Sequence, residues 1–106
     1  MAKDSAAFTD VVIDESASGD QTIVSGVAGK RIVVHNYLIV AGAAVTVRWK
    51  SGATNKSGPI ALAANGGVSA PGGIENRWFA TGIGEDLVLN LGGAVAVGGH
   101  VAYTTE

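Results

Sequence analysis

Few side chains in this 106-residue sequence could carry acid–base or nucleophilic chemistry. It has no cysteine, and its only histidines are His35, inside an apolar run, and His100, beside a glycine pair. These surroundings favour a structural or interface role for each histidine over that of a general base. Glu85 and Asp86 are adjacent acids on an expected turn, which favours solvated carboxylates over a catalytic pair. The sequence therefore predicts a protein that is not an enzyme.

Known motifs for metals and cofactors are incomplete in this chain. Two histidines without cysteine or paired acids make a poor metal site. Residues 26–31 resemble a phosphate-binding loop, but Val24 stands at its first glycine position and Arg31 at its Ser/Thr position. The dinucleotide fingerprint that begins at residues 82–84 has Leu87 at its third glycine. We therefore expect no metal and no cofactor.

The two tryptophans are candidates for stacking on a sugar ring. Trp49 shares the strand parity of Val45 and Val47, which predicts a place in the core. Trp78 follows Arg77 at the start of an expected strand, where it would line either an interface or a pocket. The sequence leaves both alternatives open for Trp78.

The composition indicates a protein that associates. Charged residues make up 15% of the chain, and hydrophobic residues 47%, whereas about 25% charged residues is usual. A small domain with so few charges has little with which to cover its surface, so part of that surface is expected to be an interface. The net charge of -2 gives no footprint for nucleic acid. No apolar run reaches the length of about 18 residues that a membrane-spanning helix needs.

Residues 29–50 are expected to form a long β-hairpin around which the chain is organised. The second limb alternates between apolar and polar residues, as a half-buried strand does. The first limb, residues 32–40, is apolar at both parities and must be covered on both faces, by a second layer or by another subunit. Its polar interruption at His35 and Asn36 predicts a β-bulge.

The whole chain is expected to be all-β, a single antiparallel β-sandwich or jelly roll. About eight short strands are separated by turn signals roughly every 8 to 12 residues, and no run has a helical period. The predicted core comprises Ile32, Val34, Val47, Trp49, Leu87, Leu89 and Val101.

Residues 1–18 are expected to form an N-terminal arm, and residues 19–106 the domain. The first 20 residues hold five acids and one base, whereas six bases stand between residues 21 and 77. Phe8, Val11 and Ile13 could add a short strand to a neighbouring sheet edge. A disordered tail is the alternative. The N-terminus lacks the apolar core of a signal peptide, which indicates synthesis in the cytoplasm.

Four turn-and-strand segments of the chain carry a resemblance: residues 29–34, 47–54, 62–67 and 96–101. Over about residues 19–106, the chain resembles the small structural proteins of tailed bacteriophages. Members of this type are jelly rolls similar to capsid cement (decoration) proteins, which commonly sit as trimers on the outer capsid. Similar modules occur at tail-fibre tips. The resemblance carries over no functional residue.

The resemblance implies a homotrimeric cement protein of the virion, made in the host cytoplasm, which binds the major capsid protein and stabilises the capsid surface. The alternative is a receptor- or carbohydrate-binding module of a tail fibre, in which Trp78 and the polar loop of residues 51–58 would be exposed. The apolar first limb supplies the trimer-interface candidates Val33, His35, Tyr37 and Ile39. A buried interfacial histidine would make assembly sensitive to acid. The candidates for capsid or neighbour contact are Phe8, Val11, Ile13 and Trp78.

Overall fold

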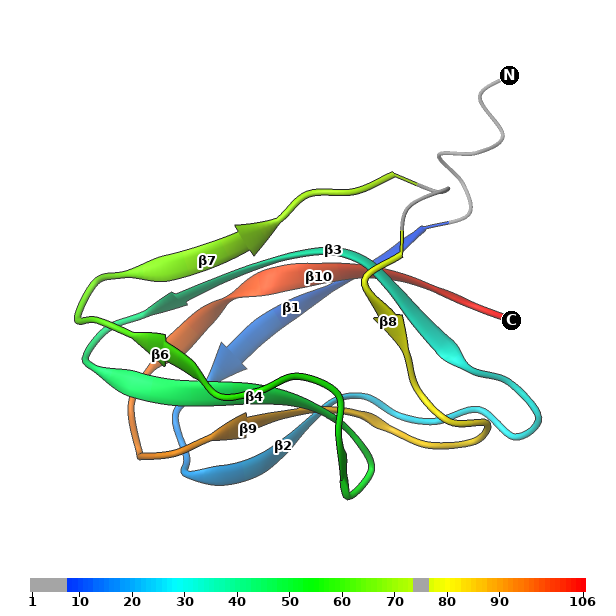
Figure 1. Cartoon of the computed structure of the whole chain (residues 1–106), viewed down its shortest axis with the longest axis horizontal. Coiled ribbons are helices and arrows are strands. Elements are labelled where there is room, and N and C mark those ends of the chain that lie inside the picture. Colours follow the sequence, from blue (N-terminus) through cyan, green and yellow to red (C-terminus); the bar gives the residue numbers. More distant parts are fainter. Residues whose placement is uncertain (1–7, 74–76) are drawn as a thin grey trace.

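Two antiparallel β-sheets face each other across one apolar core (Figure 1). The computed structural model describes residues 8–73 and 77–106. Within these residues the chain forms ten strands and no helix. The predicted all-β sandwich is therefore confirmed. Because the described residues contain no helix, every described side chain that could form a site lies on a strand or on a loop beside one.

Sheet A contains both the first and the last strand. Its order is β1 (Thr9–Glu15), β10 (Val97–Thr105), β3 (Ile32–Ala41) and β7 (Gly67–Ala70), and the short β8 (Phe79–Ala80) also pairs with β3. Sheet B has the order β2 (Gly19–Val24), β9 (Leu87–Leu91), β4 (Val45–Ser51) and β5 (Thr54–Asn55), and β6 (Ile60–Leu62) also pairs with β4. One outer position of each sheet is thus shared by two short strands, so the strand count exceeds the predicted eight.

The predicted hairpin of β3 with β4 is wrong. The two strands lie in different sheets, and residues 42–44 cross from one layer to the other. Backbone hydrogen bonds Ala41 N to Gly66 O (2.9 Å) and Gly42 N to Ala96 O (2.8 Å) hold the start of this crossing. The inward residues of β3 and β4 therefore approach the same core from opposite sides, which a flat hairpin would not allow.

The predicted bulge in β3 is confirmed. Val34 and Asn36 pair with consecutive residues of β10, so His35 between them has no partner in the register. The bulge reverses the parity of the strand: Ile32 and Val34 face the core before it, and Ile39 faces the core after it. This reversal explains why the sequence of β3 reads as apolar on both faces.

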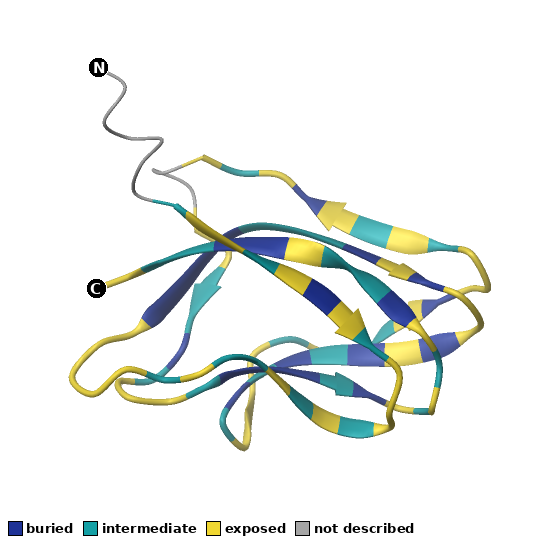
Figure 2. Ribbon diagram, turned by 180° about the vertical axis from the view of Figure 1, so that it is seen from behind, coloured by how far each residue is buried: buried dark blue, intermediate teal, exposed yellow. Residues whose placement is uncertain are grey.

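Trp49 lies at the centre of the core and is fully buried. Its ring centroid is 5.2 Å from that of Tyr37 and 5.8 Å from that of Phe79, so aromatic residues of sheet A contact this residue of sheet B across the core. All the predicted core residues are buried. Figure 2 shows how buried residues alternate with exposed ones along the strands, as a two-layer sandwich requires.

Residues 9–15 do not form an arm. They are strand β1, which pairs with β10 of the same chain from Thr9–Tyr103 to Glu15–Val97. The reason is that β10 is long and needs a partner along its second edge, and that Val11 and Ile13 both face the core. Residues 1–7 of the predicted arm lie outside the described residues.

Gly99 allows β10 to pass close to β3. Its φ is +148°, and a Cβ atom placed there would lie 1.9 Å from the carbonyl oxygen of Leu38. No other residue type fits such an approach.

The acids Glu85 and Asp86 are not simply solvated. Ser51 Oγ donates to a carboxylate oxygen of Glu85 and accepts the backbone N–H of Gly82 at 2.9 Å. Asp86 Oδ1 accepts the backbone N–H of Gly26 at 2.6 Å. Glu85 is exposed, as expected, and both acids in addition connect the turns at one end of sheet B through these hydrogen bonds.

Candidate functional site

The outer face of sheet A combines exposed aliphatic side chains with acids. Val12 on β1 is 74% exposed and Val40 on β3 is 42% exposed. Asp10 and Asp14 stand two residues before and after Val12 and are also exposed. Across the sheet, Val12 pairs with His100, which in turn pairs with Leu38. The row from β1 to β3 is therefore an accessible strip that is partly apolar and acidic at its β1 edge.

His35 is held within the chain rather than offered to a partner. Its side chain is 3% exposed. Nδ1 lies 3.1 Å from the carbonyl oxygen of Gly73, and Nε2 lies 2.8 Å from Thr104 Oγ1. The ring centroid of Phe8 is 5.1 Å from that of His35. His35 therefore joins the loop after β7 to the outer side of the sheet, and the predicted interface role is corrected.

The other predicted trimer residues are also used inside the domain. Val33 and Ile39 have no exposed area, so their side chains offer nothing to a second subunit. Tyr37 packs edge-on against Trp49 while part of its surface lines a groove. The parity reversal at the bulge explains Tyr37 and Ile39, because the core takes the odd-numbered residues of β3 after it. Val33 lies before the bulge, on the face opposite to Ile32 and Val34, and is buried there outside the core cluster.

Of the predicted contact residues, only Trp78 is largely exposed. It is 53% exposed, whereas Ile13 is 1% exposed and Val11 packs against the core. Phe8 contacts the ring of His35. Val12, the apolar residue of β1 that faces outward between two exposed acids, was missed. Its signal was available, because Val11 and Ile13 share a parity that leaves Val12 alone on the other face.

A groove of about 370 Å³ lies on sheet A beside the loop after β7. Asn36 Nδ2 donates to the carbonyl oxygen of Gly72 at 3.0 Å, and Trp78 Nε1 donates to that of Pro71 at 3.2 Å. Both bonds fix the loop that forms one wall. The groove is lined by Asn36, Tyr37, Leu38, Ser69, Ala70, Pro71, Gly72 and His100. It offers an apolar floor with a few polar groups, next to an exposed indole.

Sheet B presents polar side chains on its outer face. Asp20 accepts a hydrogen bond from Asn90 Nδ2 at 2.7 Å and forms an ion pair with Lys50 Nζ at 3.0 Å. The hydrogen bond from Asn90, followed by that from Lys50, lowers the pKa of the Asp20 carboxyl below its usual value. In the same face, the Nε of Arg48 is buried and has no hydrogen-bond partner among the described residues.

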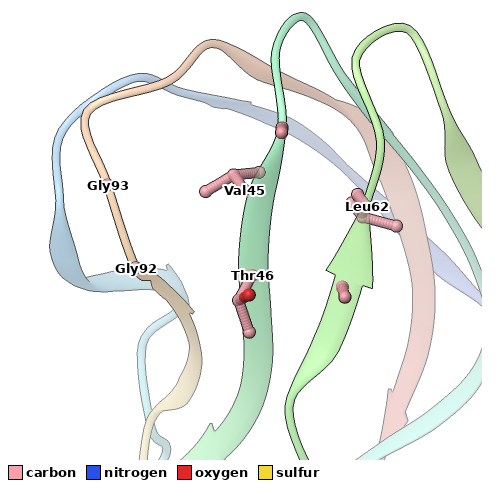
Figure 3. Close-up of a pocket in the computed structure, with 7 residues that line it drawn as sticks. Val45, Thr46, Leu62, Gly92 and Gly93 are labelled. Atoms are coloured by element: carbon pink, nitrogen blue, oxygen red, sulfur yellow. The ribbon is translucent and has the colours of Figure 1, made fainter.

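A second hollow, of about 400 Å³, lies at the end of sheet B where β4 begins. Figure 3 shows Thr46 on β4 between the turn of Gly92 and Gly93 and Leu62 on β6. The hollow exists because several of the residues around Thr46 are alanines and glycines. The lining residues are Ala44, Val45, Thr46, Ala61, Leu62, Gly92 and Gly93. No charged side chain lines this hollow, which suits an aliphatic group.

Within residues 8–73 and 77–106, no cluster of three or more His, Cys, Asp or Glu side chains could hold a metal ion. Across the same residues, no helix is long and apolar enough to cross a membrane.

No protein-family model, curated protein or solved structure matches the chain.

Proposed function

We propose that the chain is a non-enzymatic structural protein of a virion, a capsid cement protein. It binds the major capsid protein at the outer capsid surface as a homotrimer and stabilises that surface. The observation that carries the proposal is the outer face of sheet A, where Val12 and Val40 remain exposed on a domain with 15% charged residues. Exposed aliphatic groups on a surface with few charges favour association.

A jelly roll is the topology that this proposal assigns to the sandwich. If β5 with β6 and β7 with β8 each count as one position, the ten strands occupy eight positions. The first position then pairs with the last, the second with the seventh, the third with the sixth and the fourth with the fifth. This nested pairing is that of one long hairpin wound into two sheets, and it supports the jelly roll of the resembling phage proteins.

The proposed mechanism is mechanical. A rigid sandwich that contacts neighbouring capsomers adds buried area across their boundary, so separating them would expose more surface to water. Trimerisation would multiply each weak contact, since three linked binding surfaces act together. The capsid would then resist the internal pressure of packaged DNA.

The test is binding to DNA-filled capsids that lack the protein. We expect added protein to sediment with these capsids at a fixed stoichiometry and to raise the temperature at which they release DNA. Bovine serum albumin at the same concentration is the control. Protein that stays in the supernatant at every concentration, with release unchanged, would contradict the proposal.

The alternative function is that of a receptor- or carbohydrate-binding module of a tail fibre. The specific observation that favours it is the exposed indole of Trp78 beside the groove on sheet A. Aromatic rings with a polar edge suit sugar rings. Binding of the purified protein to host cells or to a glycan array, abolished in Trp78→Ala and retained in Val27→Ala, would favour this role over the capsid role. Val27 is also exposed and lies in a turn.

A further inference from the structure

The outward residues of β1 form an acid–valine–acid pattern. Asp10, Val12 and Asp14 point away from the core, while Val11 and Ile13 point into it. Residues two apart on a strand stand about 7 Å apart on the same face. Among the described residues, β1 pairs only with β10, so this row lies at an edge of sheet A. An exposed valine between two carboxylates is therefore presented to other molecules.

The hollow on sheet B has the complementary pattern. Arg48 stands two residues after Thr46 on β4, so its Cα lies about 7 Å from that of Thr46 and both face outward. It forms no ion pair with any described residue, and its Nε is buried without a hydrogen-bond partner. A buried donor without an acceptor is unfavourable. Arg48 is thus a cation without an anionic partner among the described residues, and a carboxylate placed beside its guanidinium would supply one.

We propose that a second copy of this chain fills the hollow with Val12 and places one of the flanking carboxylates against Arg48. Val12 would enter the hollow beside Thr46. An acid two residues from Val12 would then lie against Arg48, which is two residues from Thr46. Because Asp10 and Asp14 flank Val12, a carboxylate faces Arg48 whether β1 runs parallel or antiparallel to β4 of the other copy. The inference rests on the proposed trimer and names the surfaces that build it.

This contact is heterologous, because it joins sheet A of one copy to sheet B of the next. Such contacts close into rings when the rotation permits, and a three-membered ring is one closed form. The competing contact is an antiparallel pairing of β1 with β1 of another copy. Centred on Val12, it would set Asp10 opposite Asp14 of the other strand, and like charges placed so are unfavourable.

Cysteine cross-linking tests the contact directly, because the natural chain has no cysteine. Val12→Cys and Ala61→Cys would be purified separately, mixed and oxidised mildly. Ala61 is exposed and lines the hollow. We expect a disulfide between the two variants in the mixture and little in either variant alone. The variant with both substitutions should give covalent trimers.

Two results would overturn the contact. One is efficient cross-linking of Val12→Cys with itself, which would indicate the β1–β1 pairing. The other is no cross-linking in the mixture, since disulfides need Cα atoms within about 7 Å of each other. Sedimentation of the natural chain separates this failure from that of the proposed function. If the natural chain is a trimer that binds capsids but the cysteines do not cross-link, the proposed function stands and the proposed contact is wrong. If the natural chain is a stable monomer, both proposals are wrong.

Charge reversal provides an independent measurement. Arg48→Glu should raise the concentration at which the trimer dissociates by about tenfold. Replacing both Asp10 and Asp14 by Lys in the same chain should restore most of the loss. As a matched control, Lys56→Glu reverses an exposed charge outside the hollow and should change dissociation less than about threefold. Equal effects of the two single reversals would overturn the role of Arg48.

Discussion

Asp20 is the point at which three strands of sheet B are joined by polar side chains. Asn90 and Lys50 both donate to its carboxylate, from β9 and β4. At the residue scale such a group has a measurable signature, because its protonation is coupled to folding. His35 likewise acts within the domain, because its ring connects Gly73 of a loop to Thr104 of β10.

The lowered pKa of Asp20 predicts a loss of stability in acid. The folded-state pKa lies below the unfolded value, near 3.8, because Asn90 first and Lys50 second stabilise the carboxylate. The contribution is therefore present above the unfolded pKa and is lost as the pH falls through the folded pKa. It should be below about 1 kcal/mol, because the side chain is 47% exposed and water screens it.

Urea denaturation between pH 2 and pH 7 measures this effect. The difference in unfolding free energy between the natural chain and Asp20→Asn should be positive at pH 7 and should shrink below about pH 4. Arg77 also lowers the pKa of Glu106, so the difference between the two chains is the quantity to follow. A difference that is constant across this range would contradict the prediction.

His35→Ala should destabilise the chain by about 2 to 3 kcal/mol, since it removes a buried ring and leaves its hydrogen-bonding partners unsatisfied. His100→Ala is the matched control, because His100 is exposed on the same sheet. That change should stay within about 0.5 kcal/mol. Chemical denaturation at pH 7 gives both values, and similar losses for the two variants would refute the structural role of His35.

At the element scale, local patterns determine which face of a strand is buried but not which strand lies beside it. The alternation in β4 identified Val47 and Trp49 as core residues, and both are buried. The same region was expected to be a hairpin, because residues 42–44 have no feature that separates a tight turn from a crossing between sheets. The polar pair at His35 did reveal the bulge, since polar residues rarely interrupt an apolar strand otherwise.

The candidate surfaces were harder to predict than the core. The parity of Val11 and Ile13 leaves Val12 on the other face of β1, but the sequence does not show that this face stays uncovered, as its 74% exposure does. The hollow on sheet B depends on small residues from separate segments, which leave no pattern in the sequence. Trp78 was expected at an interface or a pocket, and its exposure agrees with either alternative.

Gly99→Ala should disrupt the pairing of β10 with β3. An added Cβ would overlap the carbonyl oxygen of Leu38 at a position with positive φ. We expect a loss of at least about 3 kcal/mol or failure to fold. Gly58→Ala is the control, because nothing lies within 4 Å of a Cβ placed there. Thermal unfolding of the two variants should differ by many degrees, and matching midpoints would contradict the close approach.

At the scale of the whole molecule, the first and last strands are neighbours, and both ends of the described chain lie at one end of the sandwich (Figure 1). Sheet A therefore depends on contacts between residues that are far apart in the sequence. β10 lies between β1 and β3, so it holds the sheet together from within. Much of the cooperativity of unfolding should come from this one strand.

This arrangement predicts that a circular permutant will fold. A glycine–serine linker would join the ends beside β1 and β10, and the chain would be opened between Ala28 and Gly29, in an exposed turn. The unfolding midpoint should fall by no more than about 10 °C. A permutant opened between Val101 and Ala102, which are buried in β10, should not unfold cooperatively. Calorimetry of both chains provides the measurement.

Because β10 lies between β1 and β3, sheet A cannot form during synthesis until β10 has been made. A ribosome synthesises β1 before β10, and the interval between them is roughly 5 to 20 s at usual elongation rates. During that interval β1 has no hydrogen-bonding partner in its sheet, and the inward side of Ile13 has no core to enter. The nascent chain therefore carries an unpaired and partly apolar first strand until β10 has emerged.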